Sequence, residues 1–301
     1  MKLKGILSDK NIAVHIALWL GLVVLMTAPA MLVWYSVAGH DPSAEALKTF
    51  QATQTFTVFI LPMLLAAWLC VDDPWKRLCL DKGMSWQTAG LAVLMMIVFS
   101  PGINLLSKLN EQLVLPDFLA RLEAELQLRE EQAAMLTDLM AKADNIPTLL
   151  LNLLVMAVLP AVGEELCFRG GCQGMFPEGT CGPYKNTRLR AHTHVAVWIT
   201  AILFSALHFQ FYGFVPRMLL GALLGYMLCY TGSLYVPMLA HFTNNAVALV
   251  CYYMEGKGVV GPDVLENLGS GDTWWIGLIS LLTGSALMWL FVQRQSSAPR
   301  P

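Results

Sequence analysis

Eight apolar segments limit this chain to a membrane-spanning, all-helical fold. Each is long enough, or nearly long enough, to cross a hydrocarbon core of about 30 Å. Backbone N–H and C=O groups in lipid must be hydrogen-bonded within their own segment, which favours helices. We therefore predict an all-α, polytopic membrane helical bundle that forms a single membrane domain over residues 1–301. The predicted spans lie near residues 12–37, 56–71, 86–106, 148–173, 193–214, 216–230, 234–254 and 273–293.

The composition supports this class of protein and argues against others. The chain is 56% hydrophobic and 13% charged, whereas about a quarter of the residues in a soluble domain are charged. The net charge of −2 argues against a nucleic-acid partner and leaves membrane lipid as the expected surroundings. The seven cysteines include no C-x-x-C pair, so we interpret them as reduced packing residues rather than as disulfides or a zinc site.

Basic residues predict how the chain is oriented in the membrane. They concentrate before the first span, in alternate loops and after the last span, at Lys2, Lys4, Lys10, Lys76, Arg77, Lys82, Lys185, Arg188, Arg190, Arg294 and Arg300. Cytoplasmic loops carry an excess of such residues. We therefore expect a multi-pass protein of the inner (plasma) membrane with both termini cytoplasmic. The segment 12–37 is longer than a signal-peptide core, so it is expected to be a retained span.

The loop at 107–147 is the longest one between predicted spans. Residues 118–129 have apolar side chains at helical spacing with acidic residues between them. The segment therefore predicts one or two amphipathic helices on the extracytoplasmic face, ended by Pro147. A lid and a partner surface are alternative roles, but a solvated connector is the simplest expectation.

The stretch 158–170 places three charged residues inside an apolar segment. A charged side chain at the centre of a membrane helix costs about 2.5–3.5 kcal/mol even on insertion-based scales. Glu165 and Arg169 are four residues apart and can pair on one helix face. Glu164 lies about 100° around the helix from Glu165 and faces a different space. This arrangement is the one that a buried acid/base group beside a structural ion pair would need. The alternative interpretation is a helix end whose charged side chains simply reach the lipid headgroups.

Two more polar positions lie in later spans. His208 is predicted within an apolar helix, one turn after Phe204, and His241 shares a helix face with Asn245. A single histidine in a membrane helix is most often a packing residue. Two histidines, an asparagine and Glu164 on three separate spans instead suggest one polar chamber in the bundle.

Several chemistries fit such a chamber. The chain contains neither H-E-x-x-H nor G-x-S-x-G, so an ordinary zinc-protease helix and a serine nucleophile elbow are absent. A glutamate with a histidine can deprotonate water, and a histidine with an asparagine can donate to an oxyanion. The same groups could bind a metal through two histidines and one glutamate, or relay protons in a transporter.

The ordered motifs resemble those of the CPBP family, the CAAX proteases and bacteriocin-processing enzymes also called Abi. Residues 164–169 match E-E-x-x-x-R, residues 204–208 match F-x-x-x-H, and residues 241–245 match H-x-x-x-N. Residues 231–234 add the T-G-S-L turn. The resemblance covers about 148–250, and we expect a catalytic core over 148–254.

The resemblance implies an intramembrane glutamic endopeptidase that acts on a peptide or protein substrate without a cofactor or metal. Glu164 would be the general base that activates water, with His208 assisting. His241 and Asn245 would stabilise the oxyanion.

Glu165, Arg169 and Phe204 would support the geometry of this site. A metal-dependent protease is the alternative within the same chemistry. A proton-coupled transporter and a non-proteolytic immunity or scaffold protein are alternatives outside it. The substrate and the oligomeric state are not predicted from the sequence.

Overall fold

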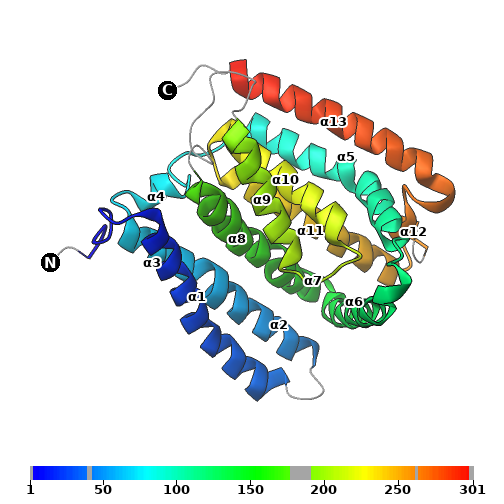
Figure 1. Ribbon diagram of the computed structural model, residues 1–301. Helices are drawn as coiled ribbons and strands as arrows, with labels where there is room; N and C mark the ends of the chain where they lie inside the picture. Colours follow the sequence, from blue (N-terminus) through cyan, green and yellow to red (C-terminus); the bar gives the residue numbers. More distant parts are fainter. Residues whose placement is uncertain (1–2, 39–42, 177–190, 262–263, 298–301) are drawn as a thin grey trace.

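The computed structural model describes residues 3–38, 43–176, 191–261 and 264–297, and all regular structure in these ranges is helical (Figure 1). The predicted all-α class is therefore confirmed. The α-helices are α1 (Ile12–Val33), α2 (Ala44–Gln54), α3 (Leu61–Cys70), α4 (Pro74–Arg77), α5 (Trp86–Glu111), α6 (Ala120–Ala141), α7 (Ile146–Asn152), α8 (Leu159–Glu165), α9 (Ala191–Ala206), α10 (Phe214–Thr231), α11 (Tyr235–Gly256), α12 (Val264–Asn267) and α13 (Trp274–Ser297).

Four π-helical segments extend or join these helices. They are η1 (Trp34–Ala38), η2 (Thr55–Ile60), η4 (Leu153–Val158) and η5 (Leu166–Gln173). As a result α2, η2 and α3 form one continuous rod, and α7, η4, α8 and η5 form another.

The described part of the chain contains six helices that are long and apolar enough to cross a membrane. They are Ile12–Ser36, Ala44–Cys70, Trp86–Glu111, Ile146–Gln173, Phe214–Thr231 and Gly271–Ser296. The chain is a multi-pass membrane protein, and the predicted count of eight spans is approximate. The span predicted at 193–214 is the shorter apolar helix α9, with 16 residues. The span predicted at 234–254 is α11, which is long but carries several polar residues of the candidate site.

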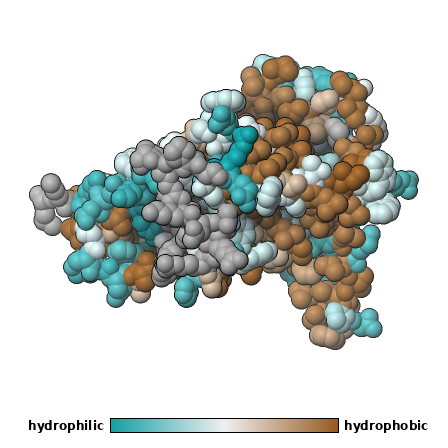
Figure 2. All heavy atoms as spheres, turned by 90° about the horizontal axis from the view of Figure 1, so that it is seen from above, coloured by the Kyte–Doolittle hydropathy of each residue, from teal (hydrophilic) through white to brown (hydrophobic). Residues whose placement is uncertain are grey.

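The rod from α7 to η5 occupies the middle of the bundle (Figure 1). One side of it packs against η2, and the other contacts α11. Beyond α11 lie α5 and then α13, while α9 and α10 pack together and against η5. Figure 2 shows apolar side chains spread over much of the face seen from above, and hydrophilic ones gathered toward the end that carries the N-terminus. The large exposed apolar residues of α13, such as Trp275, Leu282 and Trp289, fit contact with lipid.

Prolines explain where two of the four π-helical segments occur. Pro62 and Pro160 are the second residues of α3 and of α8, the helices that directly follow η2 and η4. A proline has no N–H and its ring clashes with the carbonyl four residues earlier. A wider turn just before the proline relieves this conflict and keeps the rod continuous. The central rod therefore passes Pro160 without breaking, four residues before Glu164.

The predicted amphipathic helix in segment 107–147 is present as α6. Its side chains are mostly exposed, but it is more than a connector because it holds the loop that precedes α10. Glu130 Oε2 accepts from the Tyr212 N–H at 3.3 Å, and Gln127 Nε2 donates to the Tyr212 hydroxyl at 3.3 Å. From α5, Asn110 Nδ2 donates to the carbonyls of Phe211 and Tyr212. Its extracytoplasmic location stays a prediction.

Some predicted features fall on residues that the structure does not describe. These are the basic loop with Lys185, Arg188 and Arg190, together with Lys2 and Arg300. Among the cysteines, Cys70, Cys167, Cys172, Cys229 and Cys251 are free, as expected. The expectation is wrong for Cys79, which is disulfide-bonded.

Ser280 of α13 compensates for a backbone hydrogen bond that α5 lacks beside Pro101. Pro101 interrupts the backbone ladder of α5, and the next residue, Gly102, donates its N–H to Ser280 Oγ at 2.9 Å. The same hydroxyl donates to the Val98 carbonyl at 2.5 Å, which Gly102 would reach in an unbroken helix. Ser280 thus replaces one missing helical hydrogen bond with two that cross between helices.

Replacing Ser280 with alanine is expected to lower the free energy of unfolding by about 1–3 kcal/mol, because a buried N–H and a partly buried C=O both lose their partner. Thermal unfolding of the purified protein in detergent measures the loss. Ser285→Ala, at an exposed position of the same helix, is the matched control and is expected to have little effect. Equal melting temperatures for the two variants would contradict this role of Ser280.

Candidate active site

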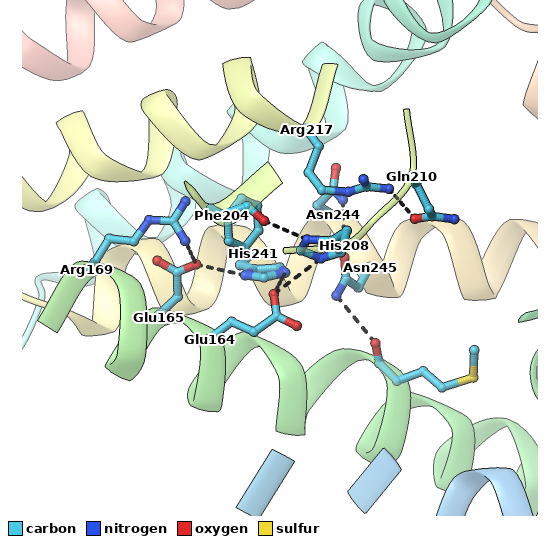
Figure 3. A network of polar contacts seen from close by, with 11 residues as sticks. Glu164, Glu165, Arg169, Phe204, His208, Gln210, Arg217, His241, Asn244 and Asn245 are labelled. Atoms are coloured by element: carbon cyan, nitrogen blue, oxygen red, sulfur yellow. Dashed lines mark hydrogen bonds and ion pairs between the residues drawn. The ribbon is translucent and has the colours of Figure 1, made fainter. Parts of the chain in front are cut away.

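A fully buried ion pair lies at one end of the polar cluster (Figure 3). Arg169 Nη1 is 2.7 Å from Glu165 Oε1, and both side chains are 0% exposed. Glu165 is the last residue of α8 and Arg169 lies one turn later in η5, so the sequence spacing correctly predicts the pair. Removing one partner of such a pair leaves an uncompensated charge in a medium that cannot solvate it.

The ion pair reaches two further helices. Arg169 Nη2 donates to the Gly221 carbonyl of α10 at 3.0 Å. The guanidinium carbon lies 4.4 Å from the centre of the Phe204 ring, a cation–π contact with α9. A Cβ atom at Gly221 would lie 3.1 Å from the Phe204 ring and 3.3 Å from Arg169, so a larger residue would crowd this close approach of the helices. Gly225, four residues later on α10, is buried as well, so this pair of glycines packs inside the bundle.

Glu165 also orients His241. Its Oε1 lies 2.8 Å from His241 Nδ1. This carboxylate oxygen already accepts from Arg169, so Nδ1 of His241 carries the hydrogen and donates it. The second ring nitrogen, Nε2, then points away from Glu165 and into the space beside Glu164 (Figure 3).

His208 is oriented in the same way but by a different group. Its Nδ1 lies 2.7 Å from the Phe204 carbonyl, which can only accept, so Nδ1 donates and Nε2 is left free. The prediction that His208 lies within a helix is wrong, because α9 ends at Ala206 and His208 lies in the turn that follows. Phe209 has φ +54°, a left-handed conformation that ends the helix.

Glu164 faces the two free imidazole nitrogens. Its Oε2 lies 3.9 Å from His208 Nε2 and 3.9 Å from His241 Nε2. Both separations are too long for direct hydrogen bonds. The Glu164 side chain is 17% exposed, whereas Glu165 is 0% exposed. The neighbouring glutamates therefore differ as predicted, because Glu165 is bonded within the fold and Glu164 faces two histidines from other parts of the chain.

Phe204 forms the wall behind both histidines. Its ring centre lies 5.0 Å from that of His208 and 6.0 Å from that of His241, with edge-to-face geometry. It also contacts Phe168 at 5.2 Å. Phe204 thus keeps water away from the Glu165–Arg169 pair and leaves the imidazole rings few orientations.

The two asparagines of α11 differ in their surroundings. Asn245 is one turn after His241, and its Nδ2 donates to the Met156 carbonyl of η4 at 3.4 Å, a long hydrogen bond. Asn244 donates to Asn245 Oδ1 at 3.3 Å and lines a cavity of about 310 Å³ between α5 and α11. Figure 3 places Asn245 beside His208 and Glu164, so it is the asparagine that faces the histidines.

The structure adds one charged residue that the sequence analysis did not single out. Arg217, in the first turn of α10, donates from Nη2 to Gln210 Oε1 at 2.6 Å. Figure 3 shows both side chains at the end of the cluster away from Arg169. An arginine inside an apolar segment is itself a sign of function, but the segment 216–230 was interpreted only as a span.

The described residues contain no group of three or more His, Cys, Asp or Glu side chains that could hold a metal ion. Glu164 and the two histidines come nearest to such a set, but their polar atoms are 3.9 Å apart. The side chains of the polar cluster contact one another through hydrogen bonds and the Glu165–Arg169 ion pair.

The ion pair gives a direct prediction for stability. Arg169→Ala is expected to lower the free energy of unfolding by about 3–5 kcal/mol, because Glu165 would stay buried without its partner. The control is Arg129→Ala on α6. Arg129 pairs with Glu125 at the same spacing and the same distance of 2.7 Å, but the two side chains are 57% and 59% exposed. That loss is expected to be about 0–1 kcal/mol in thermal unfolding, and a similar loss in both variants would refute the structural role of Arg169.

Comparison with known proteins places this cluster in a family. Residues 146–247, about a third of the chain, match the family described as type II CAAX prenyl endopeptidase Rce1-like. A protein of Bacillus subtilis (strain 168), named Uncharacterized protein YpbD, is 32% identical over 100 residues. The alignment covers 32% of this chain and 43% of that protein, so the chain spans less than half of the relative's length. No solved structure matches this chain.

The matched residues contain all three motifs and every side chain of the polar cluster from Glu164 to Asn245. The family suggested by the motifs is thus confirmed by an independent comparison. Residues 146–247 are thus similar to the Rce1-like CAAX protease family, a family of endopeptidases.

Proposed function

We propose that this protein is an intramembrane endopeptidase that hydrolyses a peptide bond with water activated by Glu164 and His208. The observation that carries the proposal is the convergence on Glu164. Two histidines from different elements each have Nδ1 engaged by an acceptor and Nε2 at 3.9 Å from the same carboxylate oxygen. Groups held in this way are ready to share a water and a substrate carbonyl.

Glu164 acts as the general base in this mechanism. It takes a proton from a water molecule while the oxygen attacks the peptide carbonyl, and His208 accepts a hydrogen bond from the same water at Nε2. The carbonyl becomes a tetrahedral oxyanion. When the carbon–nitrogen bond breaks, the proton on Glu164 passes to the leaving amine, so that one water and one peptide bond become a carboxylic acid and an amine.

His241 and Asn245 stabilise the oxyanion. The hydrogen bond of His241 Nδ1 to Glu165, at 2.8 Å, fixes the ring so that its other nitrogen faces the site, and in this role an Nε2–H donates to the oxyanion. The Asn245 amide contributes a second donor, because Nδ2 carries two hydrogens and only one of them is used in the long bond to Met156. Donors that are held in place before the reaction stabilise developing charge without having to reorganise. Glu165, Arg169 and Phe204 position these groups and do not contact the substrate.

The first experiment compares peptide cleavage by the wild type and by Glu164→Gln, with products identified by mass spectrometry in a peptide library that includes farnesylated C-terminal peptides. The variant is expected to lose at least ~100-fold in kcat, since it keeps the shape of the side chain but cannot accept a proton. Glu125→Gln, on the exposed face of α6, is the control and is expected to retain full activity.

A strong metal chelator added to the wild type tests the mechanism separately. Retained cleavage supports the metal-free reaction, while loss that is reversed by added metal would instead make Glu164, His208 and His241 ligands. Cleavage that persists in Glu164→Gln would refute the role of this residue. No cleavage by folded wild-type protein would favour a proton-coupled transporter or a scaffold protein.

We also propose that the protein lies in the inner (plasma) membrane with both termini cytoplasmic, which the basic residues at Lys76, Arg77 and Lys82 support. A reporter enzyme that is active only outside the cytoplasm, fused after residue 301, is expected to be inactive. The same reporter inserted within the α6 segment is expected to be active, and the reverse pattern would invert the orientation.

A further inference from the structure

Arg217 is a charged side chain that forms no direct ion pair within the described part of the chain. Among the described residues no carboxylate lies within 4 Å of its guanidinium, whose one hydrogen-bond partner is the neutral amide of Gln210. The Nη1 atom is buried and donates to no acceptor. A buried donor without a partner costs about 1–3 kcal/mol, and more when it is charged. Arg217 therefore needs an acceptor that the described protein residues do not supply.

The guanidinium is held in a defined place. A Cβ atom at Gly213 would lie 2.9 Å from Arg217 Nη2, so the side chain lies directly against the backbone of the loop. That loop is fixed in turn by α5 and α6, through their hydrogen bonds to Tyr212. The loop, α5 and α6 thus together define the surroundings of the Arg217 side chain, which is not free on a helix surface.

The guanidinium also belongs to the same polar cluster as Glu164. Figure 3 shows it beside His208, on the side opposite Glu164. It is close enough to interact electrostatically with His208 and with two carboxylates, Glu130 of α6 and, more weakly, Glu164, although it forms no ion pair with either one. A peptide whose scissile carbonyl lies at Glu164 would therefore bring its neighbouring groups near Arg217.

The charges of the cluster indicate which chemical group of the substrate Arg217 would bind. Arg169 is matched by Glu165, whereas the carboxylate of Glu164 has to remain available to water. Glu130 interacts with the guanidinium of Arg217 only at a distance, so among the described residues no carboxylate is paired with it directly. The planar fork of a guanidinium fits a carboxylate better than it fits a single carbonyl oxygen.

We propose that Arg217, positioned by Gln210 and Gly213, binds a carboxylate of the peptide substrate close to the scissile bond. The proposal rests on the proposed function, because it assigns the recognised group of a substrate that this site would cleave. The carboxylate has two sources, the C-terminus of the peptide or the side chain of an acidic residue. Arg217 is thereby a specificity-determining residue.

The test uses peptides that differ only in charge. From a sequence that the wild type cleaves, one pair has a free or an amidated C-terminus, and a second pair has Asp or Asn beside the scissile bond. Loss of the recognised carboxylate is expected to raise KM of the wild type by ~10-fold to ~100-fold, with a smaller change in kcat. The pair that shows the effect identifies the source of the carboxylate.

Variants of the enzyme complete the test. Arg217→Gln is expected to lose the discrimination between the members of that pair, and Arg217→Lys to keep only part of it because lysine lacks the fork. Gly213→Ala is expected to weaken the discrimination with Arg217 still present, because the added methyl group displaces the guanidinium. Arg129→Gln on α6 is the control and is expected to discriminate as the wild type does.

Binding measurements separate this inference from catalysis. Binding of a fluorescent peptide is measured for Glu164→Gln and for the double variant Glu164→Gln/Arg217→Gln. The double variant is expected to bind more weakly when the peptide carries its carboxylate, and equally well when it does not. Wild-type cleavage of both members of both pairs with equal KM would overturn the carboxylate subsite and leave the proposed function standing. Full discrimination retained in Arg217→Gln would also overturn it. Absence of all cleavage by the folded wild type would overturn the proposed function, and this inference with it.

Discussion

The buried pair of Glu165 and Arg169 is the interaction on which the other contacts of the site depend. It lies wholly inside a membrane protein, where each charge alone would be costly. The pair also links other helices, because both of its side chains form further contacts. Arg169 extends to the Gly221 carbonyl and the Phe204 ring, and Glu165 extends to His241. One ion pair therefore connects the central rod with α9, α10 and α11.

This connection explains how two adjacent glutamates serve different purposes. Consecutive residues of a helix point about 100° apart, so the partner that holds Glu165 cannot also hold Glu164. Glu164 instead faces two imidazoles whose orientation is set by groups outside the reaction, namely the Phe204 carbonyl and Glu165 itself. The π-helical segments on either side of α8 and the wide turn before Pro160 shape the rod at this point, in keeping with the frequent occurrence of such turns at functional sites.

The sequence predicted the features that depend on local spacing. The i, i+4 relation of Glu165 and Arg169 indicated their pair, and the apolar segments indicated the helical class. The prediction failed where tertiary contacts decide. The end of α9 before His208 depends on contacts such as the hydrogen bond from Ser205 Oγ to the Phe214 carbonyl, which periodicity cannot show. Likewise, the polar side chains of α11 lower its apolar character, because that helix faces the site rather than lipid alone.

The two arginines of the cluster differ in how their charges are paired. Each leaves one buried nitrogen without a hydrogen-bond acceptor, Nε of Arg169 and Nη1 of Arg217, so an unpartnered donor alone does not distinguish them. Their counter-charges do, because Arg169 has a carboxylate at 2.7 Å and Arg217 has only an amide. If Arg217 served only packing, an uncharged side chain could fill its place without the cost of burying a charge. Arg217 is held in place by a loop and two helices, near Glu164 but with no carboxylate paired to it, and the proposed explanation is an anion that arrives with the substrate.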